Sequence, residues 1–144
     1  MSRMNEGVIL LVEDDPSIAE LAKLQLERAE FTNEVLVARD GVEAIDYLLG
    51  RAREARQMPC LVLLDLHMPR LGGFDVLRRM RSEERTRFVP VVMLSSSGHP
   101  EDVRGAYEEG ANAYLEKMPG RVPWSEQVLT LARFWLGSNL SPHS

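Results

Sequence analysis

The chain has 144 residues, of which 44% are hydrophobic and 27% are charged. The length fits a single domain with one sizeable core. The composition is typical of a globular protein and argues against disordered, collagen-like and coiled-coil chains. The formal net charge of -5 opposes unassisted binding to nucleic acid. No apolar stretch approaches the roughly 18 residues that cross a bilayer, so we expect direct contact with neither nucleic acid nor a membrane.

A single cysteine, Cys60, leaves no partner for an internal disulfide. The first residues lack the basic start, apolar run and small-residue cleavage site of a secretion signal. We therefore expect a cytoplasmic protein. Only Lys23 and Lys117 among the 17 basic residues are lysines, so the position of each lysine is informative.

Five short apolar runs have the length of buried strands. They cover residues 8–12, 35–38, 61–64, 89–94 and 113–115. Segments with helical spacing of apolar residues alternate with them, at 18–26, 42–49, 74–80, 103–107 and 124–136. Because parallel strands need crossover connections, this alternation predicts an α/β fold: a doubly wound, five-stranded parallel sheet with five helices over both faces.

Proline and glycine mark the ends of the predicted helices. Pro16 can open the first helix, and Gly110 can cap the fourth. Gly41 and Gly73 stand where the second and third begin. We expect one domain over residues 1–144, with its core at about 7–137 and loose ends at 1–6 and 138–144.

Acids, a hydroxyl and a cation follow four of the predicted strands. Glu13 and Asp14 come after the first strand and Asp65 after the third. Ser95 follows the fourth strand and Lys117 the fifth. Because ligands bind at the carboxyl ends of parallel strands near the point where strand order reverses, we expect these side chains at one edge of the sheet.

Carboxylates that lie close together repel one another unless a cation is present, and hard oxygen ligands suit Mg²⁺ or Mn²⁺. A divalent metal is therefore expected at this edge. Asp65 follows four apolar residues, and a carboxylate in that position can attack phosphorus to give an acyl phosphate. Lys117 can balance phosphoryl charge, and Ser95 can donate a hydrogen bond to a phosphoryl oxygen.

Together these residues resemble the receiver domain of two-component response regulators over about Val8 to Leu136, nearly the whole chain. The resemblance rests on the pair Glu13-Asp14, the stretch Asp65-Leu66-His67-Met68-Pro69 with Gly73 beyond it, Ser95 after Pro90-Val91-Val92-Met93-Leu94, and Gly110-Ala111 with Tyr114 and Lys117. It implies a flavodoxin-like sheet with strand order 2-1-3-4-5. It also implies a signalling module that contacts other proteins and is not a turnover enzyme.

The resemblance implies a metal site at the acids. Asp14 and Asp65 would give carboxylate oxygens to Mg²⁺, and the backbone carbonyl of His67 would supply a third ligand. Glu13 would hold a coordinated water. Asp15 lies one place beyond the pair and is expected outside this set.

It also implies a role for each residue that faces the phosphoryl group. Asp65 would be the phosphoacceptor and take the group from a histidine of a kinase. Ser95 and Lys117 would bind the phosphoryl group. Tyr114 would be an aromatic switch that changes position when Ser95 moves.

Two segments are similar to stand-alone receivers that partner bacterial phytochrome histidine kinases: Gly41-Val42-Glu43-Ala44, and Phe134-Trp135-Leu136. The loop after the fifth strand departs from the family. There the lysine is normally followed at once by a proline in a cis peptide, whereas Lys117 is followed by Met118 and then Pro119. Only the Met118–Pro119 bond can adopt cis at modest cost, and we expect Lys117–Met118 to be trans.

Two enzyme-like alternatives share this fold. A phosphatase or phosphotransferase would use Asp65 as a covalent nucleophile, but such enzymes commonly carry a general acid two residues later, where this chain has His67. A flavin-binding module would need a phosphate loop after the first strand, and that position holds only acids. The His67 side chain is expected to face solvent, because no second histidine is near it in sequence.

Two further patterns favour structural interpretations. Arginines at positions 70, 78, 79, 81, 85 and 87 alternate with acids, which is typical of a solvated helix face. Ser96 is expected to cap a helix that begins near Pro100.

The last predicted helix carries an apolar stripe of Trp124, Val128, Leu131 and Trp135, which we expect to face inward. Leu129, Ala132 and Leu136 lie beside this stripe and support it. Phe134 falls outside it. The alternative that Phe134 packs under the chain end stays open, but aromatic residues are enriched in interfaces and two-fold dimers are the commonest assembly. We therefore predict a homodimer through the fourth helix, fifth strand and fifth helix, the face that carries Tyr114.

Overall fold

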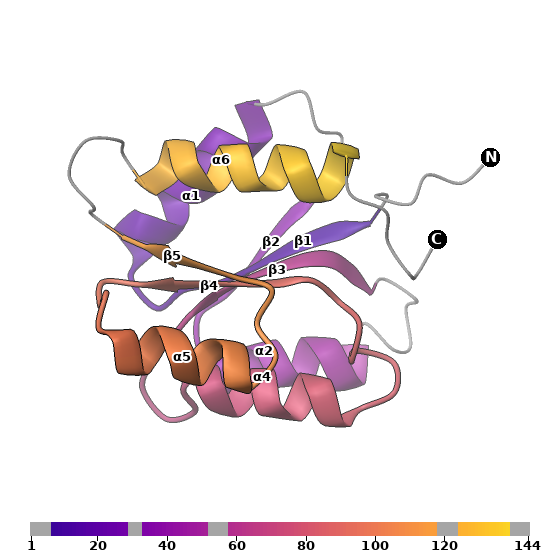
Figure 1. Cartoon of the computed structure of the whole chain (residues 1–144). Helices are drawn as coiled ribbons and strands as arrows, with labels where there is room; N and C mark the ends of the chain where they lie inside the picture. The colour runs from indigo at the N-terminus through magenta and orange to yellow at the C-terminus, as the bar shows by residue number, and fades with distance from the viewer. Residues whose placement is uncertain (1–6, 29–32, 52–57, 118–123, 139–144) are drawn as a thin grey trace.

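The computed structural model of the chain describes residues 7–28, 33–51, 58–117 and 124–138 (Figure 1). Its elements are β1 (Val8–Val12), α1 (Pro16–Arg28), β2 (Val35–Ala38), α2 (Gly41–Ile45), η1 (Asp46–Arg51), β3 (Pro59–Asp65), α4 (Gly73–Ser82), β4 (Val91–Ser95), α5 (Pro100–Glu108), β5 (Ala113–Glu116), α6 (Trp124–Arg133) and η2 (Phe134–Ser138). The segments η1 and η2 are π-helical continuations of α2 and α6.

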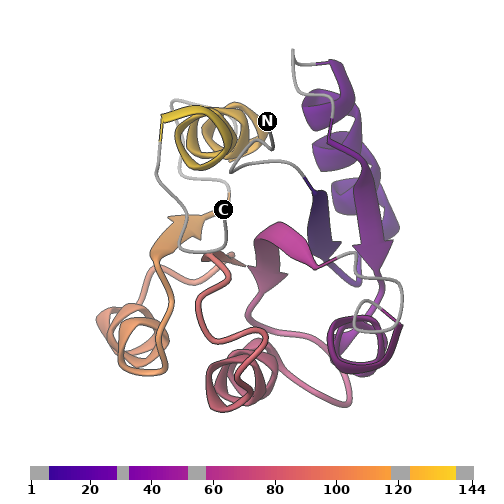
Figure 2. The same cartoon turned by 90° about the vertical axis from the view of Figure 1, so that its right-hand side faces the viewer.

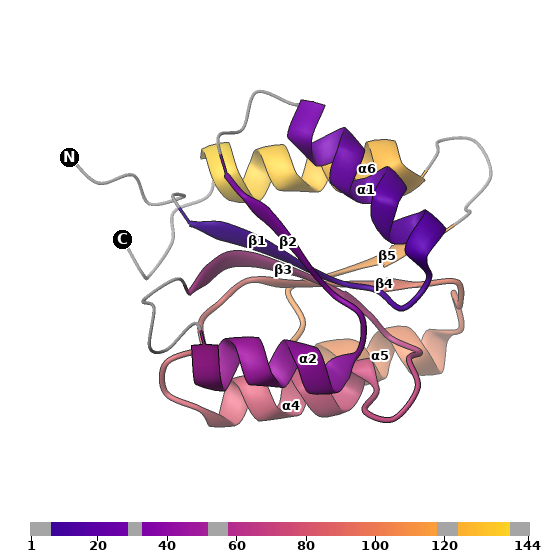
Figure 3. The same ribbon diagram turned by 180° about the vertical axis from the view of Figure 1, so that it is seen from behind.

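The five strands form one parallel sheet in the order β2-β1-β3-β4-β5, which confirms the predicted fold class and strand order. Helices α1 and α6 cover one face of the sheet, and α2, α4 and α5 cover the other (Figures 1 and 3). Figure 2 shows β5 at one edge of the sheet, between α5 and α6. Strand order reverses at β1, since β2 lies on one side of it and β3 on the other.

Two hydrophobic clusters, one on each face of the sheet, form the core. Strand residues alternate between them: Leu10 and Val12 pack toward α2, α4 and α5, and Ile9 and Leu11 pack toward α1 and α6. All five residues of β1 are buried, as expected for a parallel strand that is covered on both faces. This burial holds the end of β1, where Glu13 begins, in a fixed place.

The observed strand limits differ from the predicted ones at β4. Val89 and Pro90 are apolar and were expected in the strand, but β4 begins at Val91. The amide of Val89 donates to the Thr86 carbonyl in a turn. Pro90 has no backbone N–H and therefore cannot donate a hydrogen bond to a neighbouring strand. The Pro90 carbonyl still accepts from the Val62 amide at 2.9 Å, so the residue runs beside β3.

The predicted glycine cap of the fourth helix is confirmed. Gly110 has φ +104°, its amide donates to the Tyr107 carbonyl, and the Ala111 amide donates to the Ala106 carbonyl. These two bonds form a Schellman motif. The predicted helix starts at Pro16, Gly41 and Gly73 are also confirmed.

One detail of the helices was wrongly predicted. Ser96 does not cap α5: the cap residue is His99, whose amide donates to the Ser97 hydroxyl oxygen. On α6 and η2, Val128, Ala132 and Leu136 are buried, and Leu131 and Trp135 are half-buried and pack against the same core cluster. Among the described side chains, the predicted stripe therefore faces inward.

The predicted loose ends, residues 1–6 and 138–144, lie outside the described residues apart from Ser138, where η2 ends. The side chain of Trp124 and the Met118–Pro119 bond also lie outside them. The single-domain assignment to residues 1–144 stays a prediction. Within the described segments, no helix is long and apolar enough to span a bilayer.

Arg81 connects α4 to the two loops beyond it. Its Nε donates to the Gly110 carbonyl at 2.9 Å, and its Nη1 donates to the Val89 carbonyl at 2.8 Å. Its Nη2 donates to the Asn112 side chain at 3.0 Å. The solvated-face interpretation is therefore wrong for Arg81, although it holds for Arg78, which is exposed and pairs with acids.

We predict that Arg81→Met destabilises the fold. Methionine keeps an apolar stem but leaves several carbonyls without their donor, so the free energy of unfolding should fall by about 2 kcal/mol in denaturant titrations. The control is Arg79→Met, an exposed arginine on the same helix, which should change it by no more than about 0.5 kcal/mol. Equal effects of the two substitutions would contradict the proposed role of Arg81.

Candidate functional site

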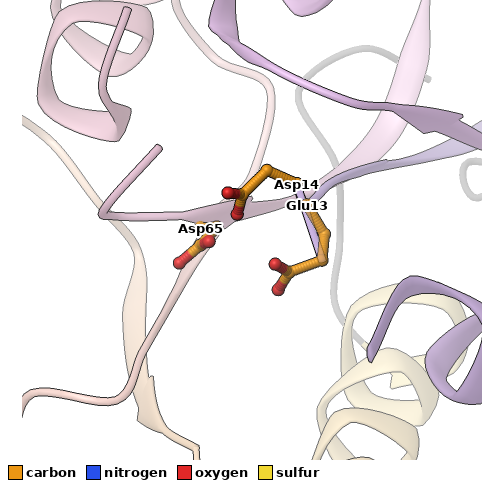
Figure 4. Close-up of side chains that lie close together, drawn as sticks. All are labelled: Glu13, Asp14 and Asp65. Atoms are coloured by element: carbon orange, nitrogen blue, oxygen red, sulfur yellow. The ribbon is translucent and has the colours of Figure 1, made fainter. Parts of the chain in front are cut away.

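Three carboxylates meet where β1 and β3 end. Glu13 and Asp14 follow β1, and Asp65 is the last residue of β3 (Figure 4). Each offers one oxygen, and these oxygens lie within 4.8 Å of one another. Glu13 and Asp65 are buried, whereas Asp14 is exposed. The structure therefore brings the predicted acids together at the point where strand order reverses.

Lys117 provides the positive charge of this cluster. It follows β5, and its Nζ lies 2.5 Å from Glu13 Oε1 and 3.3 Å from Asp65 Oδ1. Its side chain is 8% exposed. A buried ammonium is stable only with charged partners, and Lys117 has two carboxylates that come from other strands.

The Asp65 carboxyl is held in an unusual electrostatic state. Burial and the neighbouring charge of Glu13 raise its pKa from 3.8 to about 7, although Lys117 opposes that rise. In the absence of a metal, the Asp65 carboxyl therefore stays protonated at pH values at which an ordinary aspartate is ionised. A divalent cation beside the carboxyl would favour the ionised form.

The donor set fits a small, hard cation. Two buried carboxylates and one exposed carboxylate offer oxygen ligands, and the exposed Asp14 leaves one side open to water. Mg²⁺ and Mn²⁺ both prefer such ligands, and Mg²⁺ usually keeps several waters. Asp15 lies outside the cluster, because its Oδ1 accepts from the Ser17 amide at 2.9 Å and so caps α1.

His67 lies in the loop between β3 and α4. Its side chain is 65% exposed, which confirms the expectation that it faces solvent, although its Nε2 lies 3.9 Å from Asp102 Oδ2. The proposed ligand is its backbone carbonyl, and that role stays a prediction. The loop is fixed at both ends: the Leu66 amide donates to the Leu94 carbonyl, and the Gly73 amide donates to the Leu66 carbonyl, each at 2.9 Å.

Gly73 lets α4 begin directly beside the end of β3. A Cβ at this position would lie 2.5 Å from the Asp65 carbonyl oxygen and 2.8 Å from Leu66 Cα. Both are backbone atoms, so only glycine fits without a shift of the strand end. This close approach keeps the backbone of Asp65 under the first turn of α4.

Ser95 and Tyr114 are linked through Ser97. Ser95, at the end of β4, is fully buried, and its Oγ accepts from the Ser97 amide at 3.0 Å. The Tyr114 hydroxyl donates to the Ser97 carbonyl at 2.7 Å, and partial burial raises its pKa. The Ser97 hydroxyl in turn donates to Asp102 Oδ2 on α5 at 2.6 Å. A displacement of Ser95 would therefore reach both Tyr114 and α5.

Four residues around the site were not predicted from the sequence. Ser97 and Asp102 connect the site to α5 without a recognisable motif. Asp40 caps α2, and the spacing of Asp40 and Glu43 is a capping-box pattern that could have revealed it. Arg70 pairs with Asp40 across 30 residues of sequence, and no local signal predicts that contact.

The comparisons with known proteins agree with this site. A family model described as the response regulator receiver domain matches residues 9–123, which is most of the chain. The chain therefore belongs to the receiver domain family of two-component response regulators, as its motifs suggested.

Its relatives include small regulators of similar length. It is 39% identical to the "Probable methanogenesis regulatory protein FilR2" of Methanothrix harundinacea (strain 6Ac), over 94% of this chain and 87% of the relative. It is 33% identical to the response regulator Rcp1 of Synechocystis sp. (strain ATCC 27184 / PCC 6803 / Kazusa), over 90% of this chain and 88% of Rcp1. It also matches the DNA-binding regulator RpaA of the same organism, of which it spans only 42%.

Two solved structures are especially similar to this fold. The Mn²⁺-bound form of Rcp1 superposes with a TM-score of 0.84 at 31% identity, over 94% of this chain and 99% of that one. The phosphorylated cyanobacterial phytochrome response regulator RcpA superposes with a TM-score of 0.86 at 32% identity, over 95% of this chain and 99% of the RcpA chain. The acidic cluster of this chain thus lies in a fold that binds a divalent metal in a relative.

We predict a pH-dependent gain in stability for Asp65→Asn without metal. In the unfolded chain the pKa of an aspartate is 3.8, whereas in the folded chain the pKa of Asp65 is about 7. Between these values the folded state binds more protons, so stability falls as pH rises. Asparagine is uncharged throughout. In a metal chelator, the variant should melt above wild type at about pH 8, by clearly less near pH 5, and the difference should vanish only below the unfolded pKa of 3.8.

The control for this comparison is Asp75→Asn. Asp75 is an exposed acid on α4, outside the carboxylate cluster. Its substitution should shift the melting temperature equally at both pH values. An Asp65→Asn chain that melts below wild type at the higher pH would contradict the charge state assigned to Asp65.

Proposed function

We propose that the chain is a phosphoryl-accepting switch, with Asp65 as the phosphoacceptor. The observation that carries the proposal is the position of Lys117, 3.3 Å from Asp65 Oδ1, in a carboxylate cluster suited to Mg²⁺. Lys117 can pair with Asp65 before the reaction and with a phosphoryl oxygen after it. Asp14, Asp65 and the His67 carbonyl would hold the metal, and Glu13 would hold a coordinated water.

The phosphoryl group would come from a phosphorylated histidine of a kinase. The bond between phosphorus and the imidazole nitrogen breaks, and its electron pair returns to that nitrogen. A new bond forms between phosphorus and a carboxylate oxygen of Asp65, which gives an acyl phosphate. A bound Mg²⁺ supplies charge neutralisation at the phosphoryl oxygens. The Ser95 hydroxyl would donate a hydrogen bond to one of these oxygens.

Ser95 would transmit the effect of phosphorylation from the site to the surface. When its hydroxyl turns toward a phosphoryl oxygen, the contact between its Oγ and the Ser97 amide is lost. Ser97 also holds the Tyr114 hydroxyl and Asp102 of α5. Phosphorylation would thus alter Tyr114 and the start of α5, on the face that is available to a partner protein.

A turnover phosphatase or phosphotransferase is the alternative. Such an enzyme would need a proton donor for the leaving group close to Asp65. The residue two positions later is His67, whose side chain points to solvent and lies near Asp102. This arrangement supports a switch in which the acyl phosphate persists. The two functions differ in whether inorganic phosphate is released over many turnovers.

We further propose that the donor is a bacterial phytochrome kinase. Structural relatives of similar length include the phytochrome regulator RcpA and the bacteriophytochrome response regulators AtBRR and RtBRR. The proposed output is contact with another protein. The cytoplasmic location stays a prediction.

We predict that the wild-type chain gains one phosphoryl mass when it is incubated with acetyl phosphate and Mg²⁺. Intact-mass spectrometry measures the gain. Asp65→Asn should gain none, and Lys117→Met should react at least about tenfold more slowly, because the developing charge loses its cation. The control is Lys23→Met, which removes the other lysine and should react at the wild-type rate.

Phosphorylation of Asp65→Asn at an undiminished rate, or a reaction that a metal chelator leaves unchanged, would contradict the assignment. Steady release of phosphate far beyond one equivalent per chain would favour the enzyme.

We also propose a homodimer through α5, β5 and α6, the fourth helix, fifth strand and fifth helix of the sequence. Tyr107 on α5 is 51% exposed, and Phe134, the first residue of η2, is 50% exposed. The helices α5 and α6 lie on either side of β5, which carries Tyr114 and forms this edge of the sheet (Figure 2). An interface here would cover both aromatic rings and respond to the switch.

Sedimentation over a range of concentrations tests this dimer. Wild type should associate, more tightly after phosphorylation, and Phe134→Ala should weaken the dimer at least about tenfold, as expected for loss of an aromatic interface anchor. Phe88→Ala is the matched control, since Phe88 is 53% exposed but precedes β4. A wild type that stays monomeric with and without phosphorylation would rule the dimer out.

A further inference from the structure

The loop after the phosphoacceptor contains a strained residue. Arg70 has φ +67°, and it is the one non-glycine residue with positive φ in the described part of the chain. The Leu71 amide donates to the Pro69 carbonyl at 2.9 Å, so Arg70 is the central residue of a γ-turn. A γ-turn with positive φ is rare and strained. Such strain persists only where the surroundings impose it, and it is commonest at functional sites.

The start of α2 packs directly on this turn. A Cβ on Gly41 would lie 2.3 Å from the Leu71 carbonyl oxygen and 2.8 Å from Leu71 Cβ. Only glycine lets the two backbones approach so closely. Figure 3 shows α2 beside α4 on this face of the sheet. The β3–α4 loop therefore rests against an element that belongs to a different crossover.

The Asp40 carboxylate ties the two elements together. Its Oδ1 accepts from the Glu43 amide at 2.8 Å and so caps α2. Its Oδ2 binds Arg70 Nη2. Asp40 is 7% exposed, and the Glu43 amide, followed by Arg70, lowers the pKa of its carboxyl. One buried carboxylate thus holds both the first turn of α2 and the strained turn of the loop.

The loop also carries the backbone group that completes the proposed metal site. Hydrogen bonds at Leu66 and Gly73 fix its two ends. Met68 and Leu71 pack partly against the core. His67 lies between the fixed end at Leu66 and the turn at Arg70, so the direction of its carbonyl depends on both.

We propose that Asp40 and Arg70 are positioning residues, which clamp the β3–α4 loop so that the His67 carbonyl faces the metal held by Asp14 and Asp65. The inference rests on the proposed function, since it concerns the metal of that site. Neither residue touches the metal or the phosphoryl group. Their effect is to select one loop conformation before the metal binds, which strengthens binding by preorganisation.

The test is Mg²⁺ affinity, measured by calorimetry on the full chain. Asp40→Asn keeps an N-cap of equal quality but removes the charge that binds Arg70. Arg70→Gly removes the ion pair and also the strain of positive φ, so it should not unfold the chain. Each should weaken Mg²⁺ binding by about three- to tenfold, because the loop then samples other conformations. Melting temperatures without metal should stay close to wild type.

Two controls separate the clamp from a general change of charge. Arg70→Lys keeps a cation on the loop and should bind Mg²⁺ within about twofold of wild type. Arg78→Gln removes an arginine whose partners are Asp75 and Glu109, away from the loop, and should also leave affinity within about twofold. At saturating Mg²⁺, the phosphorylation rate of Asp40→Asn should return to the wild-type value, since neither clamp residue touches the reacting atoms.

Wild-type Mg²⁺ affinity in both Asp40→Asn and Arg70→Gly would overturn the clamp and leave the proposed function standing. A wild-type chain that binds no Mg²⁺ would contradict the proposed function and the clamp together. Weaker binding by Arg70→Lys equal to that of Arg70→Gly would also overturn the clamp, because the cation would then have no part in it.

Discussion

The structure depends on an unbalanced set of charges, most of them buried, at one edge of the sheet. Glu13, Asp14 and Asp65 bring three acidic groups together, and Lys117 is the cation that contacts two of them. One ammonium cannot neutralise three carboxylates, so the site either keeps a proton or takes up a cation. The raised pKa of Asp65 corresponds to the first state, in which the carboxyl keeps its proton. Uptake of a divalent metal would be the other, and under the proposed function it would favour the ionised carboxylate that attacks phosphorus.

The fold brings these groups together by simple means. Parallel strands deliver their carboxyl ends to one edge, and hydrophobic residues on both faces of β1 and β3 keep those ends in place. Gly73 lets α4 begin against the Asp65 backbone. A buried ion pair contributes little to stability by itself, because the loss of hydration offsets the attraction of the charges. The cluster is therefore better explained by function than by stability.

Much of this arrangement could be predicted from the sequence, because it follows from local patterns. Buried strands appear as apolar runs, and the rule for strand ends places Asp65 and Lys117 at the same edge. The resemblance to receiver domains supplied the strand order and the roles of single residues. The glycine cap at Gly110 was predictable because only a few residue types tolerate positive φ.

The remaining features depend on contacts between distant segments. Arg81 looks like any surface arginine until the loops at Val89 and Gly110 are seen to fold over it. The pair of Asp40 and Arg70 joins two crossovers, and neither residue marks the other in sequence.

The most direct test is a crystal structure with Mg²⁺ and beryllofluoride, which mimics a phosphoryl group on a carboxylate. The account predicts beryllium bonded to an Asp65 oxygen and fluorine atoms in contact with Lys117 and Ser95. The metal should then be bound by Asp14, Asp65 and the His67 carbonyl. Beryllofluoride bound to another residue, or a metal bound without Asp65, would contradict it.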